Sequence, residues 1–577
     1  MKISRYFFLN ISLFAFLFGA SLQEVSAQTP QIAKNISESK EVSEEPEKKS
    51  SVSSKADTGL VSERLLNRVG IQTDQTISIT LNDAIKKALE NNNDIEIAKN
   101  DVRIAESTLR SLLGVYDLTF TYSPTYSRQS TTGAADSSIT NRTATNSFTN
   151  DIGIGSPIKF GGGNYSTFFN TRRTSGNLTF NFLPNPTTGE VITIPILTTQ
   201  YTANLGVNFT QPILRNRNID QTRRQIKIQR KRISQTDADF RRQTILTISQ
   251  VQSAYWDLVF ALRDQQNKVA NLNLAKENLR QVDARIEAGA AAPLERAEVA
   301  TELANRESDV LVASQQVTIN ENRLKQLIIK DQTNPEWQNQ LMPTDKPVFS
   351  NDDINLDLAL KDAIENRPEL SRLKLEKEVN KIDISFFKNQ ALPQVDFVSS
   401  FSLQSLSNSR NADSFPPYFT GGYGQAVQNL FRSDAPNYSV GLTISFPLRN
   451  KTAKADLATA RIESERIEAQ TRSQEQTIVV EVRNAVQAVE TAKQRVFSAR
   501  RARENAEIQL EGERQLLAAG RSTTFLLFQR ENALTTARNS EIRAETDLNK
   551  AYSDLQRATS TTFRANGIEI ESPMEDK

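Results

Sequence analysis

The sequence of 577 residues contains no cysteine and no histidine. Without cysteine, the chain has no disulfide bonds, no thiolate nucleophile and no cysteine-based metal site. Without histidine, it lacks the commonest general base and the commonest ligand of transition metals. The remaining residues form no recognisable nucleophile–base pair, phosphate loop or metal-ligand cluster. We therefore expect neither an enzyme nor a bound cofactor or metal.

Long hydrophobic runs are also scarce. Residues 6–20 form a short apolar run after Lys2 and Arg5, and "VSA" at 25–27 provides a small-x-small cleavage site. This pattern predicts a secretory signal peptide over 1–27. The alternative is a membrane anchor, but a spanning helix needs roughly 20 apolar residues. Residues 28–74 are rich in Ser, Glu and Lys, so we predict an exported chain that begins with a disordered linker.

The rest of the chain repeats itself. Residues 81–109 resemble 356–384. In each half, strand candidates follow, and after them come a very long helix, a Gly break and a shorter helix. In the second half, Pro368 forces a break by disfavouring helical geometry at Arg367. We predict a first repeat over 75–330, a connecting segment over 331–355, a second repeat over 356–560 and a tail over 561–577.

Four segments alternate apolar and small polar residues. They lie at about 116–126, 200–210, 394–404 and 437–447. Nine or ten alternating residues match a transmembrane β-strand, although a half-buried strand of a soluble sandwich alternates in the same way. Only four such strands occur, beside very long helices, and this favours transmembrane strands over strands of a soluble sandwich. The polar connectors 129–199 and 405–436 are then expected to be extracellular loops.

The long helices carry heptads of apolar residues over at least four repeats, which indicates coiled coil. A helix over 213–288 would be about 110 Å long at 1.5 Å per residue. Four strands cannot close a barrel, and an open sheet edge in lipid leaves backbone groups unsatisfied. Several copies must therefore pool their strands. The physics does not choose among eight, twelve or sixteen strands.

Several motifs occur in order and in duplicate: "LKDAIE" followed by "NRPEL", "LPQVDF", "FTQPIL" with its counterpart "ISFPL", and two "AG" breaks. Over residues 75–560 the chain resembles the TolC-like outer membrane factor family. The resemblance implies an α+β membrane protein: a homotrimer with a twelve-stranded outer-membrane β-barrel, four strands per chain, continued by a periplasmic α-helical coiled-coil barrel. It also implies outer-membrane lipid, a periplasmic adaptor protein and an inner-membrane pump as partners, in efflux or type I secretion.

The strands leave the barrel at two prolines. Pro212 and Pro447 cannot donate to a sheet ladder and suit the strand–helix junctions. The basic run 215–232 follows the first junction. It could be a nucleic-acid patch, but an exported protein rarely meets nucleic acid, so we expect a solvated helix face or contact with anionic lipid.

The Gly breaks are expected to form helix–turn–helix tips. Gly289 and Gly520 can adopt the left-handed conformation that ends a helix, and Pro293 suits a first turn. The alternative is that each turn is a plain connector between antiparallel helices, which explains the glycine without any further function. The resemblance makes the tips the adaptor-docking and gating end, which needs small residues for close packing. These docking residues are Gly289, Ala290, Ala291, Gly520, Ser522 and Thr523.

The family's inward-facing acidic rings lie six and nine positions after the second Gly, where this sequence has Leu526 and Gln529. The acidic gate is therefore absent there, and Leu526 indicates an apolar constriction that gates by dewetting. Glu295 matches an acidic gate-lock residue of the family, with Arg521 as its shifted basic partner. An exposed pair of this kind contributes only about 0–1 kcal/mol.

Two readings of the function follow. The first is a passive exit duct in the outer membrane. The alternative is a periplasmic or surface coiled-coil structural protein, which would be soluble rather than trimeric in the membrane. The sequence does not identify the exported substrate. Soft metals are disfavoured as substrates, because the chain beyond residue 27 has two methionines and no His or Cys.

Overall fold

We describe a computed structural model of the chain, which falls into two units, residues 1–59 and 60–577. The structure describes residues 68, 70–135, 139–181, 193–289, 292–349, 353–409, 419–432 and 435–574, all within the second unit. The expected signal peptide lies outside the described residues.

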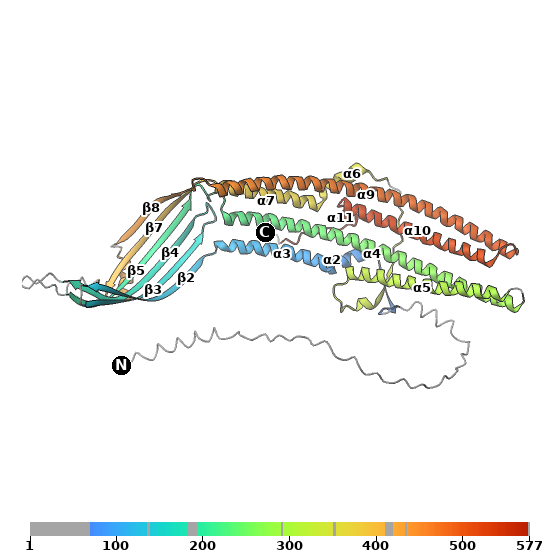
Figure 1. Cartoon of the computed structure of the whole chain (residues 1–577), viewed down its shortest axis with the longest axis horizontal. Helices are drawn as coiled ribbons and strands as arrows, with labels where there is room; N and C mark the ends of the chain where they lie inside the picture. Colours follow the sequence, from blue (N-terminus) through green and yellow to red (C-terminus); the bar gives the residue numbers. More distant parts are fainter. Residues whose placement is uncertain are drawn as a thin grey trace, which may run out of the picture. The chain divides into compact units, whose positions relative to one another are not determined.

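The strands of the main sheet lie at one end of the long helices (Figure 1). In chain order, the strands of the described residues are β1 (Gln72–Ile79), β2 (Thr119–Ala135), β3 (Ile139–Pro157), β4 (Asn164–Asn181), β5 (Thr193–Pro212), β6 (Asn339–Pro343), β7 (Gln394–Asn408) and β8 (Pro436–Ser445). The helices are α2 (Leu81–Asn91), α3 (Asn93–Leu113), α4 (Gln221–Glu287), α5 (Pro293–Ile328), α6 (Leu356–Asn366), α7 (Pro368–Gln390), α8 (Tyr423–Leu430), α9 (Lys451–Ala518), α10 (Thr524–Ala558) and α11 (Thr562–Ala565).

The main sheet corrects the prediction of four strands per chain. It has six strands in the order β2-β3-β4-β5-β7-β8, and every neighbouring pair is antiparallel. The segment 129–199, which we expected to be an extracellular loop, is largely strand: it holds β3, β4 and parts of β2 and β5. Its Ser, Thr and Asn content gave each strand few apolar residues, which hid the period of two.

Four helices continue from one end of this sheet and lie side by side. Helix α3 packs on α4, α4 on α7, and α7 on α9. Each continues one strand: α3 leads into β2, β5 into α4, α7 into β7 and β8 into α9. The predicted helix over 213–288 begins later, at Gln221, and its 67 residues span about 100 Å at 1.5 Å per residue.

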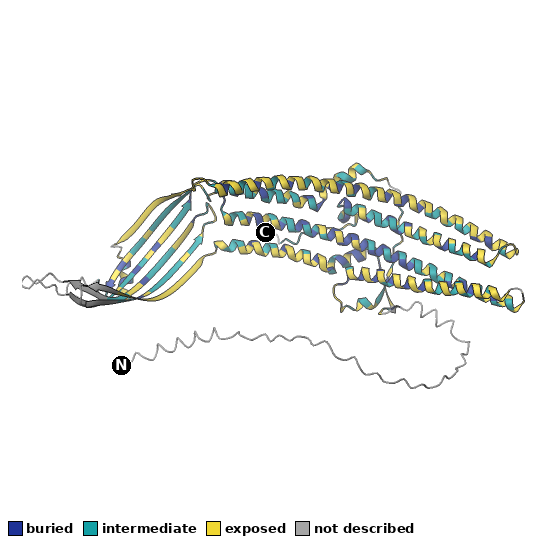
Figure 2. Cartoon of the chain, in the orientation of Figure 1, coloured by how far each residue is buried: buried dark blue, intermediate teal, exposed yellow. Residues whose placement is uncertain are grey.

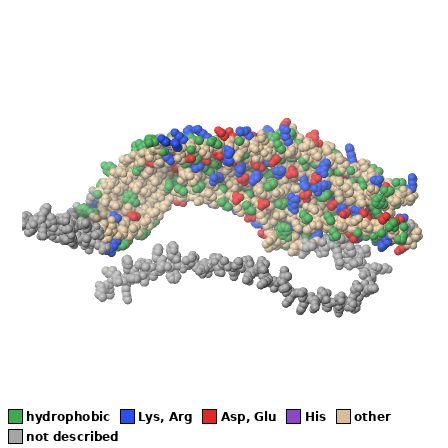
Figure 3. Space-filling model, viewed as in Figure 1, with side chains coloured by type: hydrophobic (Ala, Val, Ile, Leu, Met, Phe, Trp, Pro, Cys, Tyr) green, Lys and Arg blue, Asp and Glu red, His purple; other side chains and the backbone are tan. Residues whose placement is uncertain are grey.

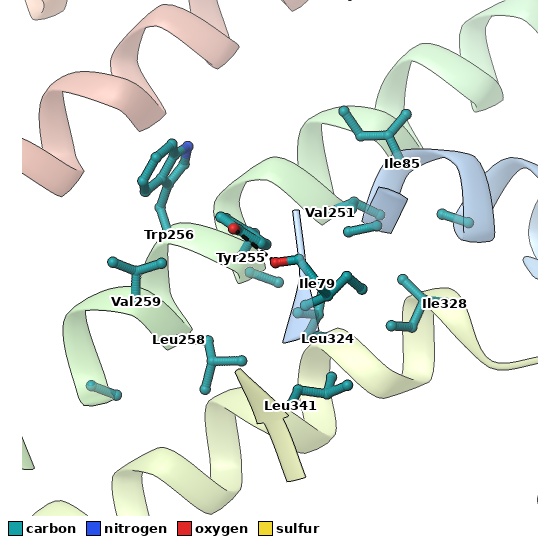
Figure 4. Packing of buried hydrophobic residues seen from close by; sticks show 14 of the residues in the cluster. Ile79, Ile85, Val251, Tyr255, Trp256, Leu258, Val259, Leu324, Ile328 and Leu341 are labelled. Carbon is teal, nitrogen blue, oxygen red and sulfur yellow. Dashed lines mark hydrogen bonds between the residues drawn. The ribbon is translucent and has the colours of Figure 1, made fainter. Parts of the chain in front are cut away.

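The heptad residues of the first repeat form the largest core. Val251, Tyr255 and Leu258 on α4 are fully buried and lie in one cluster with Leu324 on α5 (Figure 4). Ile248, also on α4, belongs to the same cluster. Burial follows the stripe along the helices, whereas their opposite faces stay exposed (Figure 2). The Tyr255 hydroxyl donates to Asp345 Oδ2 at 2.9 Å and lies 3.2 Å from the carbonyl oxygen of Ile79. Helix α4 is thereby joined to both segments that cross it.

Those crossing segments form a small parallel sheet of β1 and β6. Strand β1 begins at Gln72, inside the segment 28–74 that we expected to be a disordered linker. Arg68 also belongs to this region: it is buried and pairs with Glu321, which lies 3.0 Å from Lys325. Lys325 Nζ donates to the carbonyl oxygen of Trp337 at 2.8 Å. A buried ion cluster therefore joins Arg68 to α5.

Candidate functional site

The two faces of the main sheet differ in chemistry. Side chains alternate between the faces, so residues joined by register share a face. One row runs Phe120, Ile154, Thr167, Val207, Phe401, Tyr438. The adjacent row, on the other face, runs Thr121, Gly153, Phe168, Gly206, Ser402, Asn437. One face is therefore mainly apolar and aromatic and the other mainly small and polar, as in a wall between lipid and water.

The sheet ends in two strands that are each paired on one side only among the described residues, β2 and β8. Both carry large exposed apolar side chains: Phe120 is 64% exposed and Tyr438 is 80% exposed. A long apolar edge of this kind is a template for pairing with another strand.

The β3–β4 turn, residues 158–163, is built into the junction between sheet and helices. Its glycines make this possible, because Gly161 and Gly162 have φ values of 75° and 69°. A Cβ on Gly162 would lie 2.6 Å from the carbonyl oxygen of Asn216. Gln211 Nε2 donates to the carbonyl oxygen of Gly161 at 2.8 Å, and Lys159 lies over the Tyr116 ring at 5.9 Å.

The two junction prolines are placed differently. Pro212 is buried, is the last residue of β5 and pairs in register with Asp396. Pro447 is exposed and follows β8, which ends at Ser445. Both positions suit a strand that is ending, because proline donates no hydrogen bond to a ladder.

The Gly breaks form the turns between paired helices. Gly289 and Gly520 have φ values of 71° and 70°, and both follow directly on the C-cap residue of a long helix. The Arg521 N–H donates to the Leu516 carbonyl oxygen at 2.9 Å, which closes the end of α9. Pro293 opens α5. Ala290 and Ala291 lie outside the described residues.

The other tip residues have local partners. Thr523 caps α10, because its Oγ1 accepts from the Leu526 N–H at 3.4 Å. The Ser522 hydroxyl donates to Glu513, which also lies 3.6 Å from Arg530. Small residues at this tip therefore have structural roles that a sequence reading alone does not reveal. Their part in docking stays a prediction.

The proposed gate residues lie on an accessible face. Leu526 is 38% exposed and Gln529 is exposed, whereas their neighbour Leu527 is buried beside Leu510 and Leu534. Glu295 lies 3.9 Å from Arg285 of its own hairpin. Within the part of the chain that the structure describes, no ion pair joins it to Arg521. The Glu295–Arg521 lock therefore stays a prediction.

One acidic residue near the tips was not singled out from the sequence. Burial raises the pKa of Glu531 on α10 above its ordinary value, while Arg514 of α9 and Arg306 of α5 oppose the rise. The electrostatic influence of both arginines reaches this one carboxyl from different helices. No sequence spacing predicts this, because the three positions are far apart in the chain.

Part of the basic run 215–232 contacts α7. Arg224 lies 2.6 Å from Asp383 and stacks on Phe386, 4.9 Å from the ring centroid. Lys231 lies 2.6 Å from Glu378. Part of the positive charge of this run is thus paired with acidic residues of the same chain. Figure 3 shows a separate gathering of basic side chains near the sheet–helix junction, where α9 begins, and Arg449, Lys451 and Lys454 are exposed there.

Helices long and apolar enough to cross a membrane are not found among the described residues. A cluster of acidic side chains suited to a metal ion is likewise not found in the described ranges.

The outer membrane efflux protein family model matches residues 197–328 and 359–561, more than half of the chain. The chain belongs to this family. It is an outer-membrane protein that extends into the periplasm and is homologous to efflux channels. The family consists of channel proteins, and the recognition made from the sequence motifs is confirmed.

Solved structures show the same fold. The Campylobacter jejuni CmeC outer membrane channel is 15% identical, with a TM-score of 0.57 over 85% of this chain and 90% of that chain. The open-state Neisseria gonorrhoeae MtrE channel is 15% identical, with a TM-score of 0.55 over 83% and 88%. Vibrio cholerae VceC is 13% identical, with a TM-score of 0.56 over 83% and 95%. A search of curated proteins finds no match.

Proposed function

We propose that three copies of the chain form a passive outer-membrane exit duct for a tripartite efflux pump or a type I secretion system. The observation that carries the proposal is the two-faced open sheet. Its edges would leave unsatisfied backbone groups in lipid. Pooling of strands between copies closes the wall, with the apolar face toward lipid and the polar face toward water. The long helices then continue the duct into the periplasm.

The tips are the proposed docking surface for a periplasmic adaptor, which links the duct to an inner-membrane pump. Large apolar side chains support this role, because Leu294 is 70% exposed and Phe525 is 67% exposed beside the two turns. Large apolar side chains that are exposed at a helix end can be covered by a partner protein. Leu294→Asp and Phe525→Asp should abolish export by the assembled pump while the isolated trimer still inserts and conducts.

The gate is proposed to be an apolar constriction at Leu526, with Gln529 one turn further on. Reconstitution into planar bilayers tests it. Leu526→Ala should raise the resting single-channel conductance several-fold, and Gln529→Ala should change it less. Ile462→Ala, on an exposed position of α9 far from the tip, serves as the control. A resting conductance unchanged in Leu526→Ala would exclude this gate.

Cell fractionation separates the duct from the coiled-coil structural protein considered above. The duct requires the chain in the outer-membrane fraction as a trimer that survives mild detergent. A soluble monomer would refute it.

A further inference from the structure

The β3–β4 hairpin makes the sheet two strands wider than the helical layer beneath it. Strands β2, β5, β7 and β8 each join a long helix, whereas β3 and β4 join each other through residues 158–163. Helices α3 and α4 still pack together, although β2 and β5 are separated by the whole hairpin. The glycines of the turn pack against the junction between sheet and helices, and these contacts hold the hairpin in the sheet.

The extra strands bring the two layers to similar widths. Strands about 4.8 Å apart and tilted by about 40° give six strands an arc of about 38 Å, against about 25 Å for four. Four helices spaced about 8–10 Å apart cover about 32–40 Å. Six strands therefore cover the same share of a ring as the four helices that carry them.

The edge strands fit a second copy of the chain. Strand β2 runs away from the helices and β8 runs back toward them, so β2 of one chain and β8 of the next would pair antiparallel, as every strand pair within the sheet does. Their distances from the helices also match: five residues, 114–118, separate α3 from β2, and five, 446–450, separate β8 from α9.

We propose that the seam between copies pairs β2 with the neighbour's β8, Thr119 opposite Ser445, and that three copies of six strands close an eighteen-stranded barrel. This inference rests on the trimer of the proposed function and replaces the twelve strands expected from the family resemblance. The mouth of the duct is accordingly as wide as the helical tunnel below it.

The register follows from the sheet itself. The row of partners that starts at Thr119 passes through Gly155, Ser166, Asn208 and Ser400 and reaches Ser439. Ser439 lies six residues before Ser445 in the sequence. A stagger of six residues of about 3.3 Å over six strands about 4.8 Å apart gives a slope of about 35°, within the range of barrel tilts.

This register also matches the faces. It places Phe120 beside Ile444 and Tyr122 beside Leu442 on the apolar face, with each side chain more than half exposed in the single chain. On the polar face it places Thr125 beside Ser439. A shift by one residue would set apolar against polar side chains along the whole seam.

Disulfide cross-linking tests the seam, because the native chain has no cysteine. In one chain Thr125 and Ser439 lie on opposite edges of the sheet, so a disulfide in Thr125→Cys/Ser439→Cys can form only between copies. Oxidation should yield covalent dimers and closed trimers that a reductant separates. In the control Thr125→Cys/Thr443→Cys, the cysteines would be offset by about 13 Å, too far to bridge.

A cryo-electron microscopy map of the full-length chain in lipid nanodiscs counts the strands directly. Eighteen strands with the first cysteine pair bridged is the expected result. A trimer with twelve strands, or one bridged only in the control pair, would overturn this inference and leave the proposed duct intact. Absence of any trimer in lipid would overturn both.

Discussion

Arg367 Nε donates to the carbonyl oxygen of Ala558 across a distance of 2.8 Å. The arginine is buried between α6 and α7, and its guanidinium also pairs with Glu369 at 3.2 Å and with Glu481 on α9. One side chain thus joins the break in the second repeat to the end of α10. A carbonyl at a helix end has no intrahelical partner, so this bond satisfies it.

Arg367→Ala should lower the free energy of unfolding by about 2 kcal/mol, because it leaves the Ala558 carbonyl and the carboxylates of Glu369 and Glu481 without this partner. The shift is measured as the difference in unfolding midpoint in detergent. Arg372→Ala, at an exposed position of α7, is the matched control and should have almost no effect. Equal losses in both variants would contradict the role assigned to Arg367.

Gly162→Val should disrupt the junction between sheet and helices. Its positive φ disfavours a side chain, and a Cβ would meet Asn216, Arg223 and Asp220 within 2.9 Å. We expect a trimer that dissociates at a lower temperature, or failure to assemble, monitored by gel mobility without boiling. Gly512→Ala in α9, where a Cβ meets nothing within 4 Å, should be neutral or stabilising by up to about 1 kcal/mol.

Tyr255→Phe removes a buried hydroxyl and keeps the ring in the core. The loss leaves the Asp345 N–H, which lies 3.2 Å from that hydroxyl, without this acceptor. We expect a cost of about 1–3 kcal/mol, read from chemical denaturation. Tyr438→Phe, at an exposed position of β8, should cost much less. A neutral Tyr255→Phe would mean that β1 and β6 do not depend on this bond.

Glu531→Gln should change how stability depends on pH. Burial raises the pKa of Glu531, so in the folded chain the carboxyl keeps its proton to higher pH than in the unfolded chain. The native state therefore loses stability as pH rises from the ordinary value of 4.5 toward the raised pKa. Glutamine does not ionise, so the variant should gain in melting temperature relative to the native chain as pH rises through this window.

The melting temperature measured from pH 4 to pH 8 checks this. Glu504→Gln, on the exposed side of α9, provides the control and should follow the native curve. A constant difference between Glu531→Gln and the native chain at all pH values would show that ionisation of Glu531 is not coupled to folding.

Sequence patterns predicted the helices well, because heptads and helix-ending residues act locally. The break at Arg367 is confirmed: this residue is extended, with ψ of 122°, and Pro368 opens the next helix. The left-handed glycines at 289 and 520 were predicted for the same reason. Strands β7 and β8 carry dense apolar alternation, and they too were found.

The hairpin β3–β4 was missed because its strands spread few apolar residues among Ser, Thr and Asn. Only fragments such as Phe148, Ile152 and Ile154 keep the period of two. The contact of Glu295 with Arg285 and the influence of Arg514 and Arg306 on Glu531 were also not predicted. They depend on which helices lie side by side, and charge spacing along one helix does not encode that.

The glycine turn at 158–163 allows the number of strands in the sheet to change without a change in the number of helices. A hairpin adds one ascending and one descending strand, so it can enter the wall without reversing any neighbouring strand or displacing a helix. In the duct we propose, such a hairpin enlarges the barrel in the outer membrane while the helical layer keeps its dimensions.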